Sequence, residues 1–506
     1  MGYDGAVARA FRERGFAPHL SKREAGRDHE SQLNRRTTTQ GAARRGNAAS
    51  CHMVSRRPPR PASLPLPPVP GAPGGAILDQ VEATVRDLVA GMAPEPVPAR
   101  GRPRVLPALA LWSGLLVGIL RGASSGAGTW RLLSGAGLWS FPRFPVGDQA
   151  VYKRIAADDG ATVRAMFASI SSLLATRLAP LLPSPSPLVP WASCVVALDE
   201  TTLDGVARRL PALRDLPAGD RRLLPGKLAC AFDLRAQQFL HVDHLPDPSQ
   251  RETVHARALL ATLPPGSLVI ADMGYVSYAW FDHVVDSSHQ WLSRCRARTS
   301  MVTRQVLYAA GDGSVADRIV WLGAHKSTRA AHPVRFVEFR VAGTTRAYLT
   351  SVLDPAKLSV RDIAEAYARR WDIEMAFDLL KRHLNLHMVW SPRPALVLAH
   401  VFATLAIAQI VQALRIEVAY RAGADPFEVS IPLLMEVVPM LARQGVPDPL
   451  ATLIERGRAL GVIRPSRRIT VDVPDIPDGA YAPVSPDATA VRVPRYQRAI
   501  AASRTN

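Results

Sequence analysis

Four polar residues that could act on a phosphodiester share one face of a predicted helix. They belong to the segment YARRWDIEMAFDLLK, residues 367–381, which contains neither Gly nor Pro and is rich in helix formers. At about 100° per residue, they fall within an arc of about 60°: Tyr367, Arg370, Glu374 and Lys381. A carboxylate between two cations and a phenol could hold a metal ion beside phosphate groups. A solvated, salt-bridged helix face would give the same pattern.

The spacing of these four residues resembles a known family signature. Tyr-(2)-Arg-(3)-Glu-(6)-Lys matches the Tyr-Arg-Glu-Lys signature of DDE-type bacterial insertion-sequence transposases, members of the ribonuclease H-like superfamily. An apolar stripe beside the signature face would anchor the helix in a core: Ile373, Phe377, Leu380 and Leu384. The resemblance implies an α/β fold with a ribonuclease H-like catalytic domain, in which two Asp and one Glu hold two divalent metal ions.

Two earlier aspartates follow apolar strands, as the resemblance requires. Residues 194–198 in SCVVALDETTLDG form an apolar run that ends at Asp199, followed by a polar stretch and Gly205, so we expect a strand and then a turn. Residues 268–271 in GSLVIADMGYVS form a second run that ends at Asp272, with a turn at Gly274. We therefore predict Asp199, Asp272 and Glu374 as catalytic residues and metal ligands.

The resemblance also assigns the cofactor and the contacts to DNA. Carboxylate oxygens suit Mg²⁺, a hard cation that keeps several waters, and two such ions can assist an in-line displacement at phosphorus; Mn²⁺ would be a substitute. Tyr367, Arg370 and Lys381 would contact the phosphate backbone, since Arg can bind a phosphate through two parallel hydrogen bonds and Lys acts as a point charge. Arg369 could contact the same DNA or face solvent.

Other residues that could hold metal are interpreted as structural. Glu200 follows Asp199 directly, and neighbouring strand residues point to opposite faces, so the two are not expected to share a metal. The remaining acidic residues near the motifs are treated as structural: Asp204, Asp233 and Asp282. The sequence has no HExxH motif and no His-Cys cluster at zinc-ligand spacing.

Composition fits a polyanionic partner without proving one. The chain has 506 residues, with 62 Lys+Arg against 43 Asp+Glu and a formal charge of +19; DNA or an anionic membrane surface would satisfy this excess. An apolar content of 47% excludes a wholly disordered chain. The four cysteines lack CxxC spacing, which favours reduced thiols in a cytoplasmic protein. Two apolar stretches, 105–120 and 394–414, are interpreted as buried helices rather than membrane spans.

The chain divides into several expected regions. Residues 1–75 are rich in Arg and Pro and are expected to form a disordered basic arm. Residues 76–185 should be helical, with Asp148 as a helix N-cap; they could bind DNA or form a plain helical bundle. The catalytic domain is expected at 190–415, with a β-rich insertion at about 296–351 that includes Trp321. Helices at 416–463 and a loose tail at 464–506 would follow.

These observations lead to one functional hypothesis and two rivals. The favoured protein is a DDE transposase that binds terminal inverted repeats on double-stranded DNA and catalyses metal-dependent cleavage and strand transfer. It would act as a homodimer in a synaptic complex, in the cytoplasm of a bacterium and on the nucleoid when bound to DNA. The rivals are a stand-alone metal-dependent nuclease and a non-catalytic DNA-binding remnant of a transposase. Trp321 could stack on a flipped base or belong to the core of a sheet.

Overall fold

The computed structural model describes most of the chain after residue 104. The described residues are 105–496 without 124, 137–142, 185, 204–225, 249, 251, 324–327, 388, 392 and 467–470, together with Val85 and Val89. The basic arm expected at 1–75 lies outside them, as does most of the stretch 76–104 at the start of the helical region expected at 76–185; of that stretch only the two valines are described, both helical. Asp204 also lies outside the described residues.

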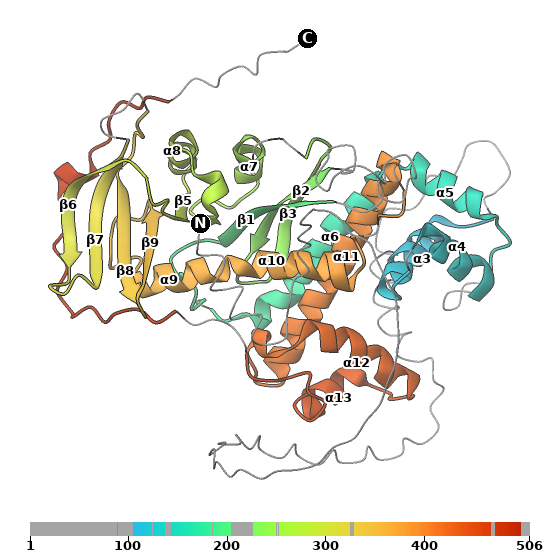
Figure 1. The fold of residues 1–506 in the computed structure, drawn as a ribbon. Helices are drawn as coiled ribbons and strands as arrows, with labels where there is room; N and C mark the ends of the chain where they lie inside the picture. Colours follow the sequence, from blue (N-terminus) through green and yellow to red (C-terminus); the bar gives the residue numbers. More distant parts are fainter. Residues whose placement is uncertain are drawn as a thin grey trace, which may run out of the picture. The chain divides into compact units, whose positions relative to one another are not determined.

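One mixed sheet of nine strands organises the described chain, in the order β3-β2-β1-β4-β5-β9-β8-β7-β6 (Figure 1). Strands β1, β2 and β3 are antiparallel neighbours, β4 and β5 run parallel to β1, and β9 joins β5 in the antiparallel sense. The strands are β1 Val195–Thr202, β2 Lys227–Asp233, β3 Gln238–Leu245, β4 Leu268–Ala271, β5 Gln290–Arg294, β6 Met301–Ala309, β7 Val315–Leu322, β8 Val334–Val341 and β9 Thr344–Thr350.

The two faces of the sheet bury two different apolar clusters. Along β1, Val195 and Ala197 belong to the larger cluster, whereas Val196 and Leu198 belong to the smaller one. This alternation follows from the two-residue period of a strand. Both faces are covered, which explains why β1 and β4 are continuous apolar runs in the sequence.

Helices cover both faces of the sheet. In chain order, they are α3 Ala108–Leu120, α4 Gly126–Arg131, α5 Asp148–Ala157, α6 Ala161–Leu178, α7 Glu252–Leu260, α8 Tyr278–Asp286, α9 Val360–Arg369, α10 Trp371–Asp378, α11 Pro394–Arg421, α12 Ile431–Arg443 and α13 Pro449–Arg456. The α-helical register gives way to π-helical turns at Leu132–Ala136 and Leu379–His383. At α5 the N-cap is Gly147, and Asp148, expected as the cap, is the first helical residue.

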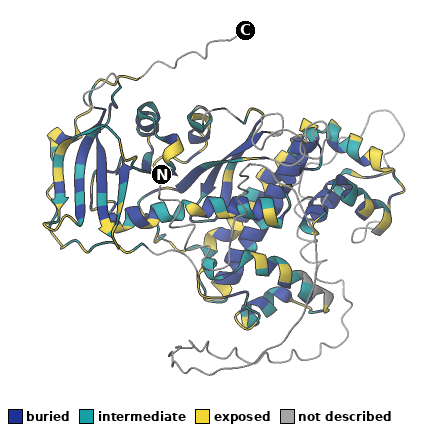
Figure 2. Ribbon diagram, in the orientation of Figure 1, coloured by how far each residue is buried: buried dark blue, intermediate teal, exposed yellow. Residues whose placement is uncertain are grey.

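The long helix α11 is the apolar centre of the larger cluster. It packs against α3, α5, α6 and strand β3, and most of its length is buried (Figure 2). By length and composition it is the one described helix that could cross a membrane, yet 78% of its most apolar window is buried inside the protein. The two apolar stretches expected as buried helices thus lie in α3 and α11.

Strands β6–β9 account for the β-rich region expected at about 296–351, and they extend the central sheet through β9. Residues 471–496, within the tail expected to be loose, run along this region through backbone hydrogen bonds, including Ala482 N to Leu307 O (2.9 Å) and Arg492 N to Ala331 O (3.0 Å). Tyr496 donates to Asp282 at 2.7 Å. This segment therefore adds contacts along the β6–β8 half of the sheet.

Candidate active site

Asp199 and Asp272 occupy equivalent positions on neighbouring parallel strands. The ladder between β1 and β4 ends with Leu198 opposite Ala271, and each aspartate is the next residue in the chain, Asp199 still within β1 and Asp272 just after the end of β4. Adjacent strands lie about 4.8 Å apart, so the register alone brings the two backbones together. Both side chains are only partly exposed.

Strand β1 does not turn after Asp199, contrary to the expectation from its sequence. It continues to Thr202 because it still pairs with β2, with Asp199 opposite Cys230 and Thr202 opposite Lys227. Asp199 therefore lies within a strand, at the point where the neighbour on its other side ends. The carboxylate is placed by two strands rather than by a loop.

Because β1 continues, Asp199 and Glu200 point to opposite faces of the sheet. Glu200 forms a buried ion pair with Lys227, and the two side chains are 7% and 6% exposed. Lys227 also donates to the backbone oxygen of Gln250 at 2.5 Å, next to helix α7. Glu200 is therefore held on the α7 face, away from Asp199.

Asp272 begins a tight turn in which Gly274, the third residue, lies close to two carboxylates. Its Oδ1 accepts a hydrogen bond from Gly274 N at 2.6 Å and caps the 3₁₀ turn Met273–Tyr275. A Cβ atom on Gly274 would collide with the carboxylates of Asp272 and Glu252. The turn thus holds the Asp272 carboxylate against the end of β4.

The segment 367–381 is not one regular α-helix, in contrast to the sequence prediction. Helix α9 ends at Arg369, α10 starts at Trp371, and a π-helical turn begins at Leu379. Around the junction, Arg370 N donates to Tyr367 O (3.1 Å) and Ile373 N to Arg370 O (3.3 Å), the three-residue spacing of a 3₁₀ turn. The junction sets the direction of Arg370, and the π turn alters the register that leads to Lys381.

The guanidinium of Arg370 lies between two of the predicted catalytic carboxylates. Its Nη1 donates to Asp199 Oδ2 at 3.3 Å and its Nη2 to Glu374 Oε1 at 2.6 Å. Burial raises the pKa of Asp199 to about 7; Arg370 and the Glu200 N–H act against this rise, and the charges of Glu374 and Asp272 add to it. The three carboxylates therefore converge closely enough to repel one another.

The donor set suits a hard divalent cation in kind. Three carboxylates lie near the ends of the central strands, and the pKa of Asp199 is raised mainly by burial and further by the charges of Glu374 and Asp272. Across the described stretches of the chain, however, no three His, Cys, Asp or Glu side chains stand at metal-ligand geometry. Arg370 occupies the space between Asp199 and Glu374, so a metal ion would have to displace this contact.

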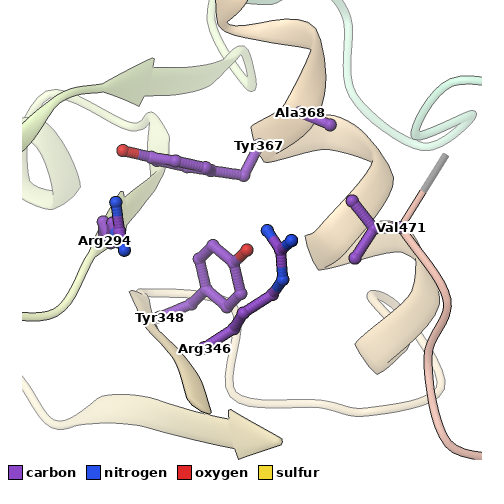
Figure 3. Close-up of a pocket in the computed structure, with 6 residues that line it drawn as sticks. All are labelled: Arg294, Arg346, Tyr348, Tyr367, Ala368 and Val471. Atoms are coloured by element: carbon purple, nitrogen blue, oxygen red, sulfur yellow. The ribbon is translucent and has the colours of Figure 1, made fainter. Parts of the chain in front are cut away.

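Tyr367 lines a small cavity of about 70 Å³ beside this site (Figure 3). The other lining residues are Arg294, Arg346, Tyr348, Ala368 and Val471. The rings of Tyr367 and Tyr348 pack edge to face with centroids 5.2 Å apart, and burial raises the pKa of Tyr367 to about 12. The Nε of Arg346 is buried without a hydrogen-bond partner in the described part of the protein. Two arginines and two phenols make this cavity suited to an anion.

Lys381 lies in the π-helical turn and is partly exposed. Its backbone oxygen accepts a hydrogen bond from the His387 backbone N–H at 3.4 Å. Lys381 therefore lies in a π-helical turn that follows α10, the helix that carries Glu374, and a backbone hydrogen bond from His387 stabilises this turn.

Asp233 and Asp282, the two described acidic residues among those treated as structural, have structural partners. Asp233 accepts hydrogen bonds from the backbone of Arg235 (2.7 Å) and Ala236 (3.1 Å) in the turn after β2. Asp282 is 2% exposed and accepts from Ala331 N (2.7 Å) and His332 N (3.1 Å). Both carboxylates thus hold turns together.

Trp321 is enclosed by two arginines. The guanidinium carbon of Arg304 lies 4.1 Å from the centre of its ring, and that of Arg492 lies 4.8 Å away. Arg492 is fixed in turn by its Nε, which donates to Ala330 O at 2.8 Å. Cation–π contacts of this kind favour the structural interpretation of Trp321.

Both arginines of the anion-suited cavity were absent from the sequence prediction. Arg294 ends strand β5, which no sequence expectation covered, and Arg346 lies on β9. Arg346 and Tyr348 are two residues apart and so share one face of β9, a pattern that the sequence does contain. The sequence does not reveal that β5 pairs with β9, and this pairing places Arg294 beside Tyr348 at the cavity.

Comparisons with known proteins find similarity to transposases. Residues 190–410 match the family described as Transposase DDE domain. A protein of Sinorhizobium fredii whose name describes it as a transposase, y4zB, is 27% identical over 146 residues, which cover 28% of this chain and 40% of that relative. A piggyBac transposase, solved by cryo-EM as a synaptic complex with hairpin DNA, aligns over 80% of this chain and 85% of its own at 11% identity, with a TM-score of 0.36. Residues 190–410 are thus similar to a DDE transposase domain.

Proposed function

We propose that this protein is a transposase that binds the terminal inverted repeats of its own element, cleaves DNA there by metal-dependent hydrolysis and joins the freed 3′-hydroxyls to target DNA. One observation carries the proposal. Asp199 and Asp272 occupy the two positions after the last pair of the β1–β4 ladder, and Glu374 lies close enough to raise the pKa of Asp199. The match of residues 190–410 to the Transposase DDE domain supports the same function.

The order of the central strands fits a ribonuclease H-like catalytic domain. Three antiparallel strands, β1 to β3, lie beside two parallel strands, β4 and β5. Strands β6–β9 would then be an insertion between the second aspartate and the helix that bears Glu374. This arrangement gives each carboxylate a separate supporting element.

Asp199, Asp272 and Glu374 would hold two Mg²⁺ ions, or Mn²⁺ as a substitute. When bound, such ions activate a water or a 3′-hydroxyl and stabilise the leaving oxygen of an in-line displacement. The protein's own contribution is to hold three mutually repelling carboxylates close together, two near the ends of the central strands β1 and β4 and one on helix α10. The hydrogen bond from Gly274 N to Asp272 (2.6 Å) and the pairing of β1 with β2 hold two of them in place.

Arg370 would exchange its present partners for a DNA phosphate. In the free protein its guanidinium donates to Asp199 and Glu374, and a phosphate accepts the same paired geometry. That exchange would free carboxylate oxygens for cations at the moment DNA arrives. Tyr367 and Lys381 would contact the adjacent backbone, and Arg346, whose Nε lacks a partner among the described residues, would add a further phosphate contact.

Cleavage of both ends of an element requires that the ends be paired. We therefore assign the active form as a homodimer in a synaptic complex, located in the bacterial cytoplasm and on the nucleoid when bound. The formal charge of +19 supports binding to double-stranded DNA through a large electrostatic contribution.

The test is Mg²⁺-dependent cleavage and strand transfer on a DNA fragment that ends in the element's inverted repeat. We expect wild type to cut and join, and Asp199→Asn, Asp272→Asn and Glu374→Gln each to lose cleavage by at least a thousandfold while binding the ends with nearly unchanged affinity. Asp282→Asn is the matched control, since Asp282 supports the turn at Ala331 and His332 rather than the site.

Three results would contradict parts of the proposal. Full cleavage by one of the three variants would remove that residue from the site. Cleavage without joining would identify a nuclease, and end binding without either reaction would identify a non-catalytic remnant.

A further inference from the structure

Arg369 and Arg370 are adjacent in the sequence but serve opposite sides of the same junction. Arg370 reaches Asp199 and Glu374. Arg369 turns inward: its Nε donates to Asp372 Oδ2 at 2.7 Å and its Nη2 to Leu234 O at 2.7 Å. Its side chain is only 18% exposed. Arg369 is therefore bound within the protein.

The partner of Arg369 is itself tied to the turn between β2 and β3. Asp372 is 6% exposed, and its Oδ2 also accepts a hydrogen bond from Gln237 Nε2 at 3.0 Å. Gln237 is 2% exposed and has a φ of 54°, a left-handed conformation that a non-glycine residue adopts only when its surroundings hold it there. Its Nε2 donates to Leu234 O as well, at 2.9 Å. The turn between β2 and β3 is thus hydrogen-bonded to the first turn of α10.

A second arginine and an aromatic ring complete this cluster. The guanidinium carbons of Arg369 and Arg415 each lie 4.6 Å from the centre of the Phe427 ring. Arg415, on α11, donates to Pro426 O at 2.6 Å. The α9–α10 junction, the β2–β3 turn, α11 and the turn at 426–428 therefore meet at one point, which we name the Arg369 clamp.

The Arg369 clamp lies on the opposite side of α10 from the candidate active site. Asp372 and Glu374 are two residues apart, about 200° around a helix. Asp372 therefore faces the hairpin while Glu374 faces Asp199. Because α10 starts at Trp371, the anchored residue lies in its first turn, and any rotation about Asp372 would swing Glu374 and Arg370 together.

We propose that Arg369 is a positioning residue that sets the orientation of Glu374 and Arg370 by fixing Asp372 to the β2–β3 turn. The proposal rests on the proposed function for its catalytic readout. The alternative is that Arg369 is a phosphate contact; its Nε and Nη2 already donate to Asp372 and Leu234, which favours the positioning role. A shift of about 1 Å in a catalytic group can cost about a hundredfold in rate.

The test compares Arg369→Met and the double variant Arg369→Met/Asp372→Asn with wild type. In the single variant the buried Asp372 carboxylate loses its ion pair with Arg369, which could prevent folding. The double variant also removes this negative charge, so it can be measured if the single variant does not fold. Arg361→Met is the matched control: it lies on the same helix α9 but in a solvent-exposed pair with Asp475. Far-UV circular dichroism spectra identify conditions under which wild type, both clamp variants and Arg361→Met are folded, and all measurements are made there.

We expect the folded clamp variants to cut the end fragment at least tenfold more slowly at saturating DNA, with end affinity within twofold of wild type. The slope of log K against log salt should stay unchanged, whereas loss of a phosphate contact reduces it by about one. Amide hydrogen exchange in 370–378 should become faster, while Arg361→Met matches wild type in all of these measurements.

Wild-type cleavage by a folded double variant would overturn the proposal, and so would a reduced salt slope. Unchanged hydrogen exchange in 370–378 would overturn it as well. If wild-type protein does not cleave at all, the proposed function fails by itself, and the exchange measurement still decides whether Arg369 holds α10.

Discussion

Loss of one partner from the buried pair of Arg335 and Asp317 should strongly destabilise the β-rich half of the sheet. Both side chains are completely buried. Arg335 Nε lies 2.9 Å from Oδ1 and 3.1 Å from Oδ2 of Asp317, and its Nη2 lies 2.6 Å from Oδ2. Its Nη1 donates to Leu358 O at 2.5 Å, next to the Ser359 cap that starts α9. The pair thus joins β7 and β8 to the helix that precedes the site.

Arg335→Met removes every one of these hydrogen bonds and leaves the Asp317 carboxylate buried without its cation. Loss of one partner of a buried pair costs about 3–5 kcal/mol, a large share of the roughly 5–15 kcal/mol by which domains are stable. With an m-value of about 2 kcal/mol/M, the urea midpoint should fall by about 2 M. Removing both charges in Arg335→Met/Asp317→Leu should restore most of that loss, since the lone buried charge is gone.

Urea unfolding followed by circular dichroism measures these differences. Arg361→Met, which disrupts an exposed ion pair, should leave the midpoint within error of wild type. The reasoning fails if Arg335→Met is as stable as wild type. It also fails if the double variant is no more stable than the single one, because the cost would then not come from the orphaned carboxylate.

Two further predictions concern DNA binding and pH. Lys381→Ala should weaken end binding and reduce the slope of log K against log salt by about one, whereas Arg382→Ala, in the same turn, should leave the slope unchanged; equal slopes for wild type and Lys381→Ala would exclude the phosphate role. His400 is fully buried against Trp390 (centroids 4.1 Å apart), and burial lowers its pKa to about 3. Its neutral form is therefore fully stabilising above the unfolded pKa of about 6.5, and stability falls by about 1.4 kcal/mol per pH unit below it. Urea titrations from pH 8 to pH 5 should show a shallower loss for His400→Phe, and parallel pH profiles would refute the assignment.

Much of the secondary structure near the site follows from local sequence patterns. The runs that end near Asp199 and Asp272 form β1 and β4, and the apolar stretch from 394 forms the buried helix α11. Four strands lie within the region expected to be β-rich. Apolar periodicity and β-branched residues are encoded within a few neighbouring positions, so these elements can be read without knowledge of the fold.

Local patterns failed where a distant partner decides the conformation. Strand β1 continues past Asp199 because β2 pairs with it, and the residues of β2 lie about thirty positions downstream. The predicted helix at 367–381 is broken at Arg370 and changes to a π turn at Leu379. At that break, Gln237 and Leu234 of the β2–β3 turn bind Asp372 and Arg369, and no helix propensity contains that information.

The groups that could do chemistry can be identified from residue types and their spacing: three carboxylates in order, and Tyr, Arg and Lys at helical spacing around the last of them. How these groups are used depends on contacts between distant parts of the chain. The β1–β4 register placed Asp199 beside Asp272, strand parity sent Glu200 to Lys227 on the other face, and the junction after α9 turned Arg370 toward the carboxylates and Arg369 into the protein. Residue types are local properties of the chain. The direction in which a side chain points, and the residues that it contacts, depend on long-range packing, which selects one of several arrangements that the same spacing allows.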